Sequence, residues 1–251
     1  MYNFFVKDDC RQGDRYIITG ADHNHIKNVL RMTVGDTILI SANGKSDLCE
    51  IETIDNDEIV APIIEEDYQN TELPLQIHLF QGLPKSDKME LIIQKAVELG
   101  VYSITPIEMK RCIVKLDDKK KKSKQTRWQA ISESAAKQSK RNTIPEINEI
   151  VSYKAALAVA KELDLLLVPY ENEDGILSTK EALTELKNAK SVGIIIGPEG
   201  GFDDAEIKQA KDAGGKTISL GKRILRTETA AITAVGMCML YTEMNLSGDN
   251  K

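Results

Sequence analysis

The first 72 residues alternate short apolar runs with polar turns, a pattern typical of short β-strands. Asn43 and Gly44 lie between two of these runs and are a strong signal for a tight hairpin. One short helix is expected over residues 21–30, with Asp22 as its cap. The close spacing of short strands favours a small β-barrel. The predicted strands cover residues 4–6, 16–19, 37–41, 47–53 and 58–64.

A different periodicity begins after residues 65–74, an acidic and polar stretch that ends in proline and is the predicted linker. Residues 86–99 carry an apolar stripe at helical spacing, and Gly100 follows as a helix-terminating glycine. Strands are expected at residues 75–80, 101–107, 164–168, 194–196 and 216–220. Helices are expected at residues 124–141, 153–163, 178–188, 206–213 and 230–240. This alternation predicts a parallel α/β domain over residues 73–251, after a first domain over residues 1–72.

Two loops that carry glycine and charge follow predicted strands in the last third of the chain. Residues 194–196 are β-branched, which suits a strand buried on both faces, and they lead into Gly-Pro-Glu-Gly-Gly at residues 197–201. A second predicted strand ends at Gly221. Because the carboxyl ends of parallel strands share one edge of a sheet, these loops predict a ligand cleft. Gly197 and Gly200 are expected to lack side chains so that a ligand can approach the main chain.

Other interpretations of these glycines are weaker, apart from one. A plain turn between strand and helix, with glycine only for tight packing, stays open for the first loop. A dinucleotide site requires G-x-G-x-x-G, which the spacing of Gly197, Gly200 and Gly201 does not fit. A P-loop at residues 214–217 fails because Ala210 stands at its first glycine and a strand follows where a helix is needed.

Two motifs resemble a known family. They are Ile-Ile-Gly-Pro-Glu-Gly-Gly-Phe at residues 195–202 and Leu-Gly-Lys-Arg-Ile-Leu-Arg-Thr-Glu-Thr-Ala at residues 220–230. Together they resemble the small-subunit (16S) ribosomal RNA uridine N3-methyltransferases of the SPOUT superfamily. The first motif alone also fits ribose methyltransferases of that superfamily, whereas the second is far more specific. Similar stretches at residues 82–88, 95–101 and 135–141 extend the resemblance over nearly the whole chain, although Lys137 stands where the family commonly has Glu.

The resemblance implies an α/β fold in which a small PUA-like, RNA-binding β-barrel precedes a SPOUT-type methyltransferase domain. That domain would have a parallel sheet and a C-terminal trefoil knot. The implied cofactor is S-adenosylmethionine, and the implied partner is 16S ribosomal RNA or the small ribosomal subunit. A homodimer is implied as well, joined through the helix at residues 230–240. That helix is apolar nearly all round and is expected to be buried on more than one side.

The implied reaction is methylation of N3 of a uridine in 16S ribosomal RNA, and the resemblance assigns residues to three roles. Predicted catalytic residues are Arg226, Glu228 and Glu199. Predicted cofactor-binding residues are Val168, Pro169, Tyr170, Gly197, Pro198, Glu199, Gly200, Leu220, Gly221, Ile224, Leu225, Thr229 and Ala230. Predicted RNA-binding residues are Arg31, Lys85, Lys88, Gln138 and Arg141; for Arg31 an ordinary surface arginine is the alternative.

The catalytic assignment follows from what methyl transfer requires. Uracil N3 must lose its proton, and a carboxylate such as Glu199 or Glu228 could take it directly or through water. Arg226 could hold the imide oxygens as charge develops, and Thr227 behind it is expected to cap the following helix. For Glu228 a structural role is the alternative, since a carboxylate is favoured in the first turn of a helix. Asp203 and its neighbour are cap-type residues of the helix at 206–213.

Two other functions stay open. One is a ribose 2′-O-methyltransferase of the same superfamily, which must activate a hydroxyl group rather than an imide. The other is a non-catalytic RNA-binding protein that retains the fold. The intact glycine loops and charged loops count against this second alternative.

Charge is distributed unevenly along the chain, whose formal net charge is −6. Residues 110–141 hold twelve basic and three acidic residues, whereas residues 1–72 hold six basic and fifteen acidic ones. A local patch, not the total, is what meets phosphates. The four lysines at 119–122 are predicted to be a solvated, mobile loop, with a flexible RNA-binding arm as the alternative. Trp128 is expected in a helix core, with base stacking as the alternative.

Composition excludes several other classes of protein. With 41% hydrophobic and 29% charged residues, the chain is typical of a globular protein, with no membrane-length apolar stretch or signal-peptide pattern. His23 and His25 lack the further ligands of a metal site, so no metal is expected. The cysteines are scattered, which favours reduced thiols and a cytoplasmic location. They are Cys10, Cys49, Cys112 and Cys238.

Overall fold

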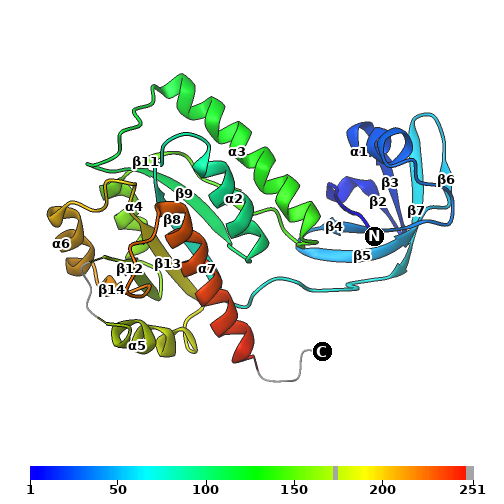
Figure 1. The fold of residues 1–251 in the computed structure, drawn as a ribbon. Helices are drawn as coiled ribbons and strands as arrows, with labels where there is room; N and C mark the ends of the chain where they lie inside the picture. The colour runs from blue at the N-terminus through cyan, green and yellow to red at the C-terminus, as the bar shows by residue number, and fades with distance from the viewer. Residues whose placement is uncertain (172–174, 247–251) are drawn as a thin grey trace. The chain divides into compact units, whose positions relative to one another are not determined.

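The computed structural model describes residues 1–171 and 175–246, so the end of the predicted second domain at residue 251 lies outside the described residues. The chain forms two compact units (Figure 1). Unit 1 consists of Met1–Glu72 and Ala136–Ile144, and unit 2 of Leu73–Ala135 and Pro145–Lys251. Residues 136–144 therefore belong to unit 1, although they follow part of unit 2 in the sequence. The predicted single boundary after residue 72 does not include this return of the chain.

Unit 1 is built on one mixed sheet. Its strands are β1 (Asn3–Phe5), β2 (Arg11–Gln12), β3 (Arg15–Thr19), β4 (Thr37–Ala42), β5 (Lys45–Glu50), β6 (Thr53–Ile54) and β7 (Glu58–Glu65). The order is β1-β4-β5-β7-β3-β2, with β6 also on β7; only the β1–β4 pair is parallel. Residues 47–53, predicted as one strand, divide into β5 and β6. The predicted hairpin is confirmed, because Asn43 and Gly44 both have positive φ, at 49° and 76°.

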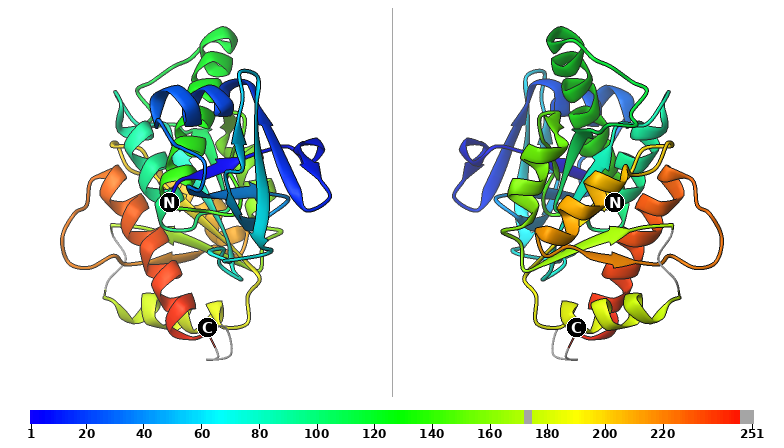
Figure 2. Two further views of the ribbon diagram at one scale, coloured as in Figure 1. Left: turned by 90° about the vertical axis from the view of Figure 1, so that its right-hand side faces the viewer. Right: turned by 90° about the vertical axis from the view of Figure 1, so that its left-hand side faces the viewer.

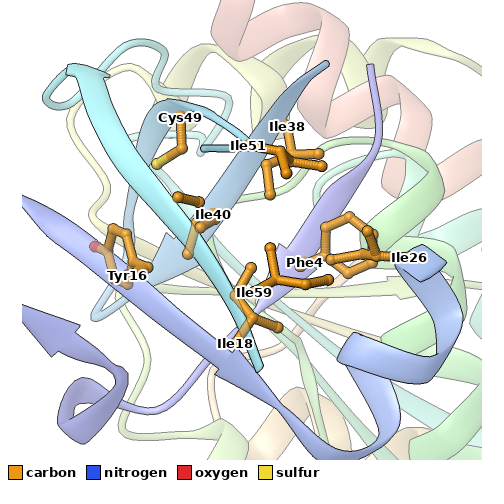
Figure 3. Close-up of a cluster of buried hydrophobic side chains, with 10 residues drawn as sticks. Phe4, Tyr16, Ile18, Ile26, Ile38, Ile40, Cys49, Ile51 and Ile59 are labelled. Carbon is orange, nitrogen blue, oxygen red and sulfur yellow. The ribbon is translucent and has the colours of Figure 1, made fainter. Parts of the chain in front are cut away.

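The core of unit 1 is a cluster of mostly aliphatic and aromatic side chains, most of them from the strands of the sheet, with Ile26 added from the segment at residues 25–29 (Figure 3). Alternate residues of each strand point inward, as the period of two requires. A register shift where β5 passes from Leu48 to Cys49 against β7 supplies a bulge, which helps the sheet to curve. The cluster comprises Phe4, Tyr16, Ile18, Ile26, Ile38, Ile40, Cys49, Ile51, Ile59 and Ala61.

The predicted helix at residues 21–30 is present in two parts, α1 (Gly20–Asn24) and a π-helical turn η2 (His25–Val29). Asp22 is not its cap. Thr19 holds that position without a side-chain cap hydrogen bond, and the Asp22 carboxylate instead accepts a hydrogen bond from Lys137 Nζ at 3.3 Å. A short 3-10 turn, η1 (Asp8–Cys10), precedes β2.

A buried ion pair explains why residues 136–144 belong to unit 1. Arg141 is only 3% exposed, and its Nε donates to both carboxylate oxygens of Glu72, at 2.9 and 3.1 Å. The same carboxylate accepts hydrogen bonds from the backbone N–H groups of Asn142 and Thr143. The prediction that Arg141 binds RNA is therefore wrong for this structure, because its guanidinium is enclosed by protein.

Unit 2 is a seven-stranded, all-parallel sheet. Its strands are β8 (Gln76–Gly82), β9 (Ser103–Glu108), β10 (Glu146–Ile147), β11 (Val151–Ser152), β12 (Leu165–Pro169), β13 (Ser191–Ile196) and β14 (Lys216–Ile218). The order is β10-β9-β8-β13-β12-β14, with β11 also on β9. Residues 192–196 of β13 are all buried, as the β-branched run predicted.

Helices cover both faces of this sheet (Figures 1 and 2). They are α2 (Lys88–Glu98), α3 (Asp118–Gln138), α4 (Tyr153–Ala160), α5 (Leu177–Leu186), α6 (Asp204–Asp212) and α7 (Thr227–Met244). Gly100 follows α2 with φ 88°, as predicted for a helix-terminating glycine. Asp203 caps α6 in a capping box with Glu206, as predicted for a cap-type residue. Among the described residues, no helix has the length and apolarity needed to cross a membrane.

Helices α3 and α7 each have one feature that the sequence did not predict. The lysines at 119–122 lie in the first turns of α3, not in a loop, whereas Trp128 is buried in the same helix as expected. Helix α7 buries Ala231, Ala234, Val235 and Cys238, but Leu240 and Met244 are 53% and 74% exposed. The helix contacts α2 and α5 as well as β8 and β13, so it is covered on more than one side as expected, and Leu240 and Met244 lie on the side that stays exposed.

We predict that Glu72→Gln destabilises the protein by about 3 kcal/mol at neutral pH, because it leaves the buried Arg141 guanidinium without its counter-charge. Burial alone would raise the pKa of Glu72, but the hydrogen bonds and charge of Arg141 and the two N–H donors hold that pKa below its ordinary value. Urea denaturation should therefore give a lower free energy of unfolding for the variant, and the difference from wild type should have its full size above the ordinary glutamate pKa. The difference should be lost as the pH falls through the lower folded-state pKa. Equal stabilities at pH 7 would contradict the prediction.

Candidate active site

A cavity of about 520 Å³ lies at the carboxyl ends of β12, β13 and β14. Its volume is within the roughly 300–1,000 Å³ that is usual for small-molecule sites. Three segments form most of its wall: the Tyr170 segment (residues 169–171), the Gly197 loop (residues 197–201) and the Gly221 loop (residues 219–226). The predicted cleft between two strand-end loops is present, and the end of β12 supplies a third side.

The Gly197 loop is held by protein packing around its glycines. A Cβ on Gly200 would lie 3.0 Å from Arg111 Cβ and 3.1 Å from the Arg111 carbonyl oxygen. A Cβ on Gly197 would lie 3.2 Å from the Phe202 ring. Packing against Arg111 and Phe202 is therefore a reason for glycine at these two positions in its own right, and the approach of a ligand to their main chain stays a prediction. A side chain at Gly200 would disturb the contact with Arg111, so the loss of ligand binding in such a variant would not show that the ligand lies beside Gly200.

The other two segments are anchored where they leave the sheet. Tyr170 donates a backbone hydrogen bond to the Ile218 carbonyl at 3.0 Å. In the Gly221 loop, the Ser219 carbonyl accepts a hydrogen bond from Thr179 Oγ1 at 2.6 Å. Gly221 has φ 105°, a conformation that favours glycine. Beyond it the loop is open to solvent, and Ile224 is 85% exposed.

A relay of hydrogen bonds joins the Gly197 loop to the start of α7. Thr227 Oγ1 donates to the Gly197 carbonyl at 2.7 Å, and Gln81 Nε2 donates to Thr227 Oγ1 at 2.9 Å. Thr227, predicted to be the cap of α7, is instead its first residue. The cap position is held by Arg226, which has an extended backbone and makes no side-chain cap hydrogen bond. These hydrogen bonds hold the start of α7 against the Gly197 loop and so position Arg226, the residue just before the helix.

Arg226 lines the cavity with an exposed side chain. Within residues 1–171 and 175–246 its guanidinium has no hydrogen-bond or ion-pair partner. Its five N–H donors are consequently available to a molecule in the cavity. Arg226 thus lies on the cavity wall, and its predicted role in stabilising charge stays a prediction.

Glu199, also on the cavity wall, is bound by one donor from the loop before α2 and one from the first residue of that helix. Its Oε1 accepts from the Lys85 backbone N–H at 3.0 Å and lies 3.1 Å from Lys88 Nζ. Burial alone would raise the pKa of Glu199, but these hydrogen bonds and the Lys88 charge lower it below its ordinary value. Glu228 Oε2 lies 3.2 Å from the same Lys88 Nζ, and the Glu199 hydrogen bond in particular raises the pKa of Lys88.

Most of the predicted cofactor-binding residues line the cavity. They are Pro169, Tyr170, Gly197, Pro198, Glu199, Gly200, Leu220, Gly221, Ile224, Leu225 and Ala230. Val168 does not, because it is buried inside β12, and Thr229 does not, because it faces solvent from α7. Sequence reasoning missed other lining residues, namely Glu171, Ile196, Gly201, Phe202, Ser219, Lys222, Arg223 and Thr227. Most of these residues are sequence neighbours of predicted residues in the same loops, so their position in the loop could have indicated that they line the cavity.

The predicted RNA-binding residues are divided between the units. In unit 2, Lys88 belongs to the cavity wall, and exposed Lys85 binds Glu199 through its backbone. In unit 1, Gln138 and Arg31 are exposed. Arg31 has a positive φ of 54° and borders a separate hollow of about 340 Å³ beside Tyr2. Across the described residues, no cluster of His, Cys, Asp and Glu has the composition of a metal site, and His23 Nε2 instead lies 3.1 Å from the Asp55 carbonyl.

Two protein-family models match the chain. An RNA methyltransferase domain matches residues 71–239, and an RNA methyltransferase PUA domain matches residues 18–64. The predicted fold class, a parallel-sheet α/β methyltransferase domain preceded by a small PUA-like unit, agrees with both matches. The trefoil knot stays a prediction.

Relatives match over nearly their whole length. Ribosomal RNA small subunit methyltransferase E of Bacillus subtilis is 38% identical, over 99% of this chain and 100% of the relative. The protein of the same name from Mesomycoplasma hyopneumoniae is 39% identical, over 95% and 99%. A crystal structure of the Neisseria gonorrhoeae protein of this name, bound to S-adenosylmethionine, superposes with a TM-score of 0.80 at 33% identity, covering 94% of this chain and 95% of that one.

The cavity built from three strand-end loops, the matched domains and these full-length similarities agree with one another. The chain belongs to the ribosomal RNA small subunit methyltransferase E family.

Proposed function

We propose that this protein transfers a methyl group from S-adenosylmethionine to N3 of a uridine in 16S ribosomal RNA. The observation that carries the proposal is that the unpartnered Arg226 and the ionised Glu199 share one cavity with the Gly197 and Gly221 loops. Membership of a ribosomal RNA methyltransferase family supports the reaction class, and the sequence motif at residues 220–230 supports uridine N3 within it.

The cavity suits S-adenosylmethionine in size and in the chemistry of its wall. Backbone groups of three strand-end loops can bind an adenine edge, and Leu220, Leu225 and Pro198 offer apolar surface. The cofactor supplies a methyl group on a positively charged sulfur. The relative from Neisseria gonorrhoeae was crystallised with this cofactor, which supports the same ligand here.

Residues of the chain then have distinct tasks in the reaction. Uracil N3 gains the methyl group and gives up its proton, which passes to the Glu199 carboxylate directly or through water. Glu199 is ionised at neutral pH and can accept a proton, and the hydrogen bonds and the Lys88 charge that lower its pKa also make it a weaker base than an ordinary glutamate. Arg226 binds the imide oxygens, where negative charge accumulates as the proton leaves. Glu228, the other predicted proton acceptor, is not among the residues that line the cavity.

Product mapping tests this function directly. The protein is incubated with methyl-labelled S-adenosylmethionine and small ribosomal subunits that lack the modification, and the labelled nucleoside is identified. We expect 3-methyluridine in 16S RNA. A 2′-O-methylated nucleoside would identify a ribose methyltransferase, and RNA binding without label transfer would identify a non-catalytic binder.

Arg226→Ala is expected to lower the single-turnover rate by about a hundredfold or more, the scale for loss of one preorganised donor. Cofactor affinity, measured by calorimetry, should change little. Arg226→Lys should recover only part of the rate, because an ammonium cannot bridge two acceptors as a planar guanidinium can. Loss of cofactor binding with an unchanged single-turnover rate would instead assign Arg226 to the cofactor pocket.

The RNA-binding surface of unit 2 is proposed to include Lys119 and Lys122, which are exposed on α3 and have no ionic partner in the described part of the chain. Removing both charges as glutamine should lower the slope of log Kd against log salt by about 1.5 for two lost phosphate contacts. The matched control removes two charges at Lys121 and Arg127, which are paired with Glu108 and Glu90. Equal slopes in the two double variants would contradict the assignment.

A homodimer through α7 remains part of the proposal. Leu240 and Met244 are exposed on the outer side of this helix and offer apolar surface to a second copy. Sedimentation equilibrium should then give twice the chain mass of 27.9 kDa. The trefoil knot and the cytoplasmic location also stay predictions.

A further inference from the structure

Lys88 reaches the cavity from outside the three segments that form most of its wall. It is the first residue of α2, and its Nζ lies between two carboxylates, 3.1 Å from Glu199 Oε1 and 3.2 Å from Glu228 Oε2. Its side chain is 29% exposed and lines the cavity. An ammonium group has three N–H donors, so two contacts with carboxylates leave at least one donor for a molecule in the cavity.

Glu228 meets the cavity only through this lysine. It is not a lining residue, its side chain is 13% exposed, and its Oε2 is buried without an aligned hydrogen-bond donor among the described residues. The ion pair with Lys88 is thus the contact that compensates the charge of this oxygen. A carboxylate placed behind a lysine in this way orients the ammonium group and is poorly placed to take a proton from a molecule in the cavity.

The charge of the cluster restricts what Lys88 can bind. Two carboxylates around one ammonium give a net charge of −1, and Glu199 itself lines the cavity. Lys222, Arg223 and Arg226 line the same cavity and can attract phosphate to their own side, but a phosphate group placed at Lys88 would be repelled by these two carboxylates at close range. A neutral carbonyl oxygen would instead gain a hydrogen bond, and the bond would strengthen as negative charge develops on that oxygen.

We propose that Lys88 donates a hydrogen bond to a carbonyl oxygen of the base that is methylated, and that Glu228 is a positioning residue for Lys88. This inference rests on the proposed function. It gives Lys88 a role at the base and not at the RNA backbone, and it leaves Glu199 as the carboxylate on the cavity wall. Arg226 and Lys88 then approach the base from α7 and α2 respectively.

A double-mutant cycle tests both parts of the proposal. Single-turnover rates are measured for Lys88→Met, Glu228→Gln and the double variant, with S-adenosylmethionine affinity measured by calorimetry. We expect Lys88→Met to lower the rate by at least about tenfold while cofactor affinity stays within about twofold. Glu228→Gln should lower the rate less, and it should have no further effect in the Lys88→Met background, because both changes act through one group. Lys88→Arg should restore part of the rate.

Lys95→Met is the matched control on the same helix, since Lys95 pairs with Glu98 and does not line the cavity. It should leave the rate unchanged. Additive losses in the double variant, or a larger loss in Glu228→Gln than in Lys88→Met, would overturn the positioning role of Glu228. A wild-type rate in Lys88→Met, or a salt slope for RNA binding lowered by about one as for a lost phosphate contact, would overturn the role of Lys88.

The nucleoside produced by the wild type separates this test from that of the proposed function. If the wild type produces 3-methyluridine and the Lys88 variants match it in rate, the proposal for Lys88 fails alone. If the product is another nucleoside, the proposed function fails first, whatever the rates of the variants. Thermal unfolding of each variant at the wild-type temperature shows that a lost rate does not reflect a lost fold.

Discussion

The burial of β13 on both faces is the constraint on which the site depends. A strand between β8 and β12 with no exposed face can present polar and charged groups only at its end, so chemistry is confined to the loop after Ile196. The neighbouring strands end at the same edge because all of them run parallel. Strand direction and burial therefore place the cavity at this edge of the sheet, and the loops form most of its wall and supply its chemical character.

The loops are in turn held by contacts from elements distant in sequence. Gln81 and Thr227 fix the Gly197 carbonyl, Lys85 and Lys88 hold Glu199, and Arg111 packs beneath Gly200. A Cβ on Gly82 would lie only 2.7 Å from the Pro198 nitrogen, so the loop after β8 also meets the Gly197 loop closely. Few of these side chains touch the cavity, yet each restricts where the charged groups on its wall can lie. Preorganisation of this kind lets Arg226 stand without a protein partner, with its donors available to a ligand.

Local patterns in the sequence were sufficient for the features that depend on neighbouring residues. The hairpin at Asn43 and Gly44, the end of α2 at Gly100, the cap of α6 at Asp203 and the buried run of β13 all follow from chemistry within a few positions. The cavity was also predicted, because its loops adjoin recognisable strands.

Features that depend on distant contacts were missed or assigned wrongly. Arg141 was expected to bind RNA because it stands among basic residues, but its partner Glu72 is 69 positions away. Asp22 looks like a helix cap until Lys137 is placed beside it. Lys88 has a motif around it, but its position between Glu199 and Glu228 depends on three segments meeting at one sheet edge. Nothing in local periodicity encodes such meetings.

The charge of residues 110–141 also depends on contacts that are distant in sequence, and it affects how many basic residues are available to RNA. Counted along the chain, residues 110–141 carry twelve basic and three acidic residues. In the folded chain, several of the basic residues face carboxylates from elsewhere: Lys110 pairs with Asp203, Lys121 with Glu108, Arg127 with Glu90, Lys137 with Asp22 and Arg141 with Glu72. Each such pair removes a charge from the field that a phosphate meets at close range. Fewer basic residues of this segment are therefore available to RNA than the sequence indicates, and the exposed lysines without an ion-pair partner among the described residues include Lys115 as well as the proposed RNA contacts Lys119 and Lys122 on α3.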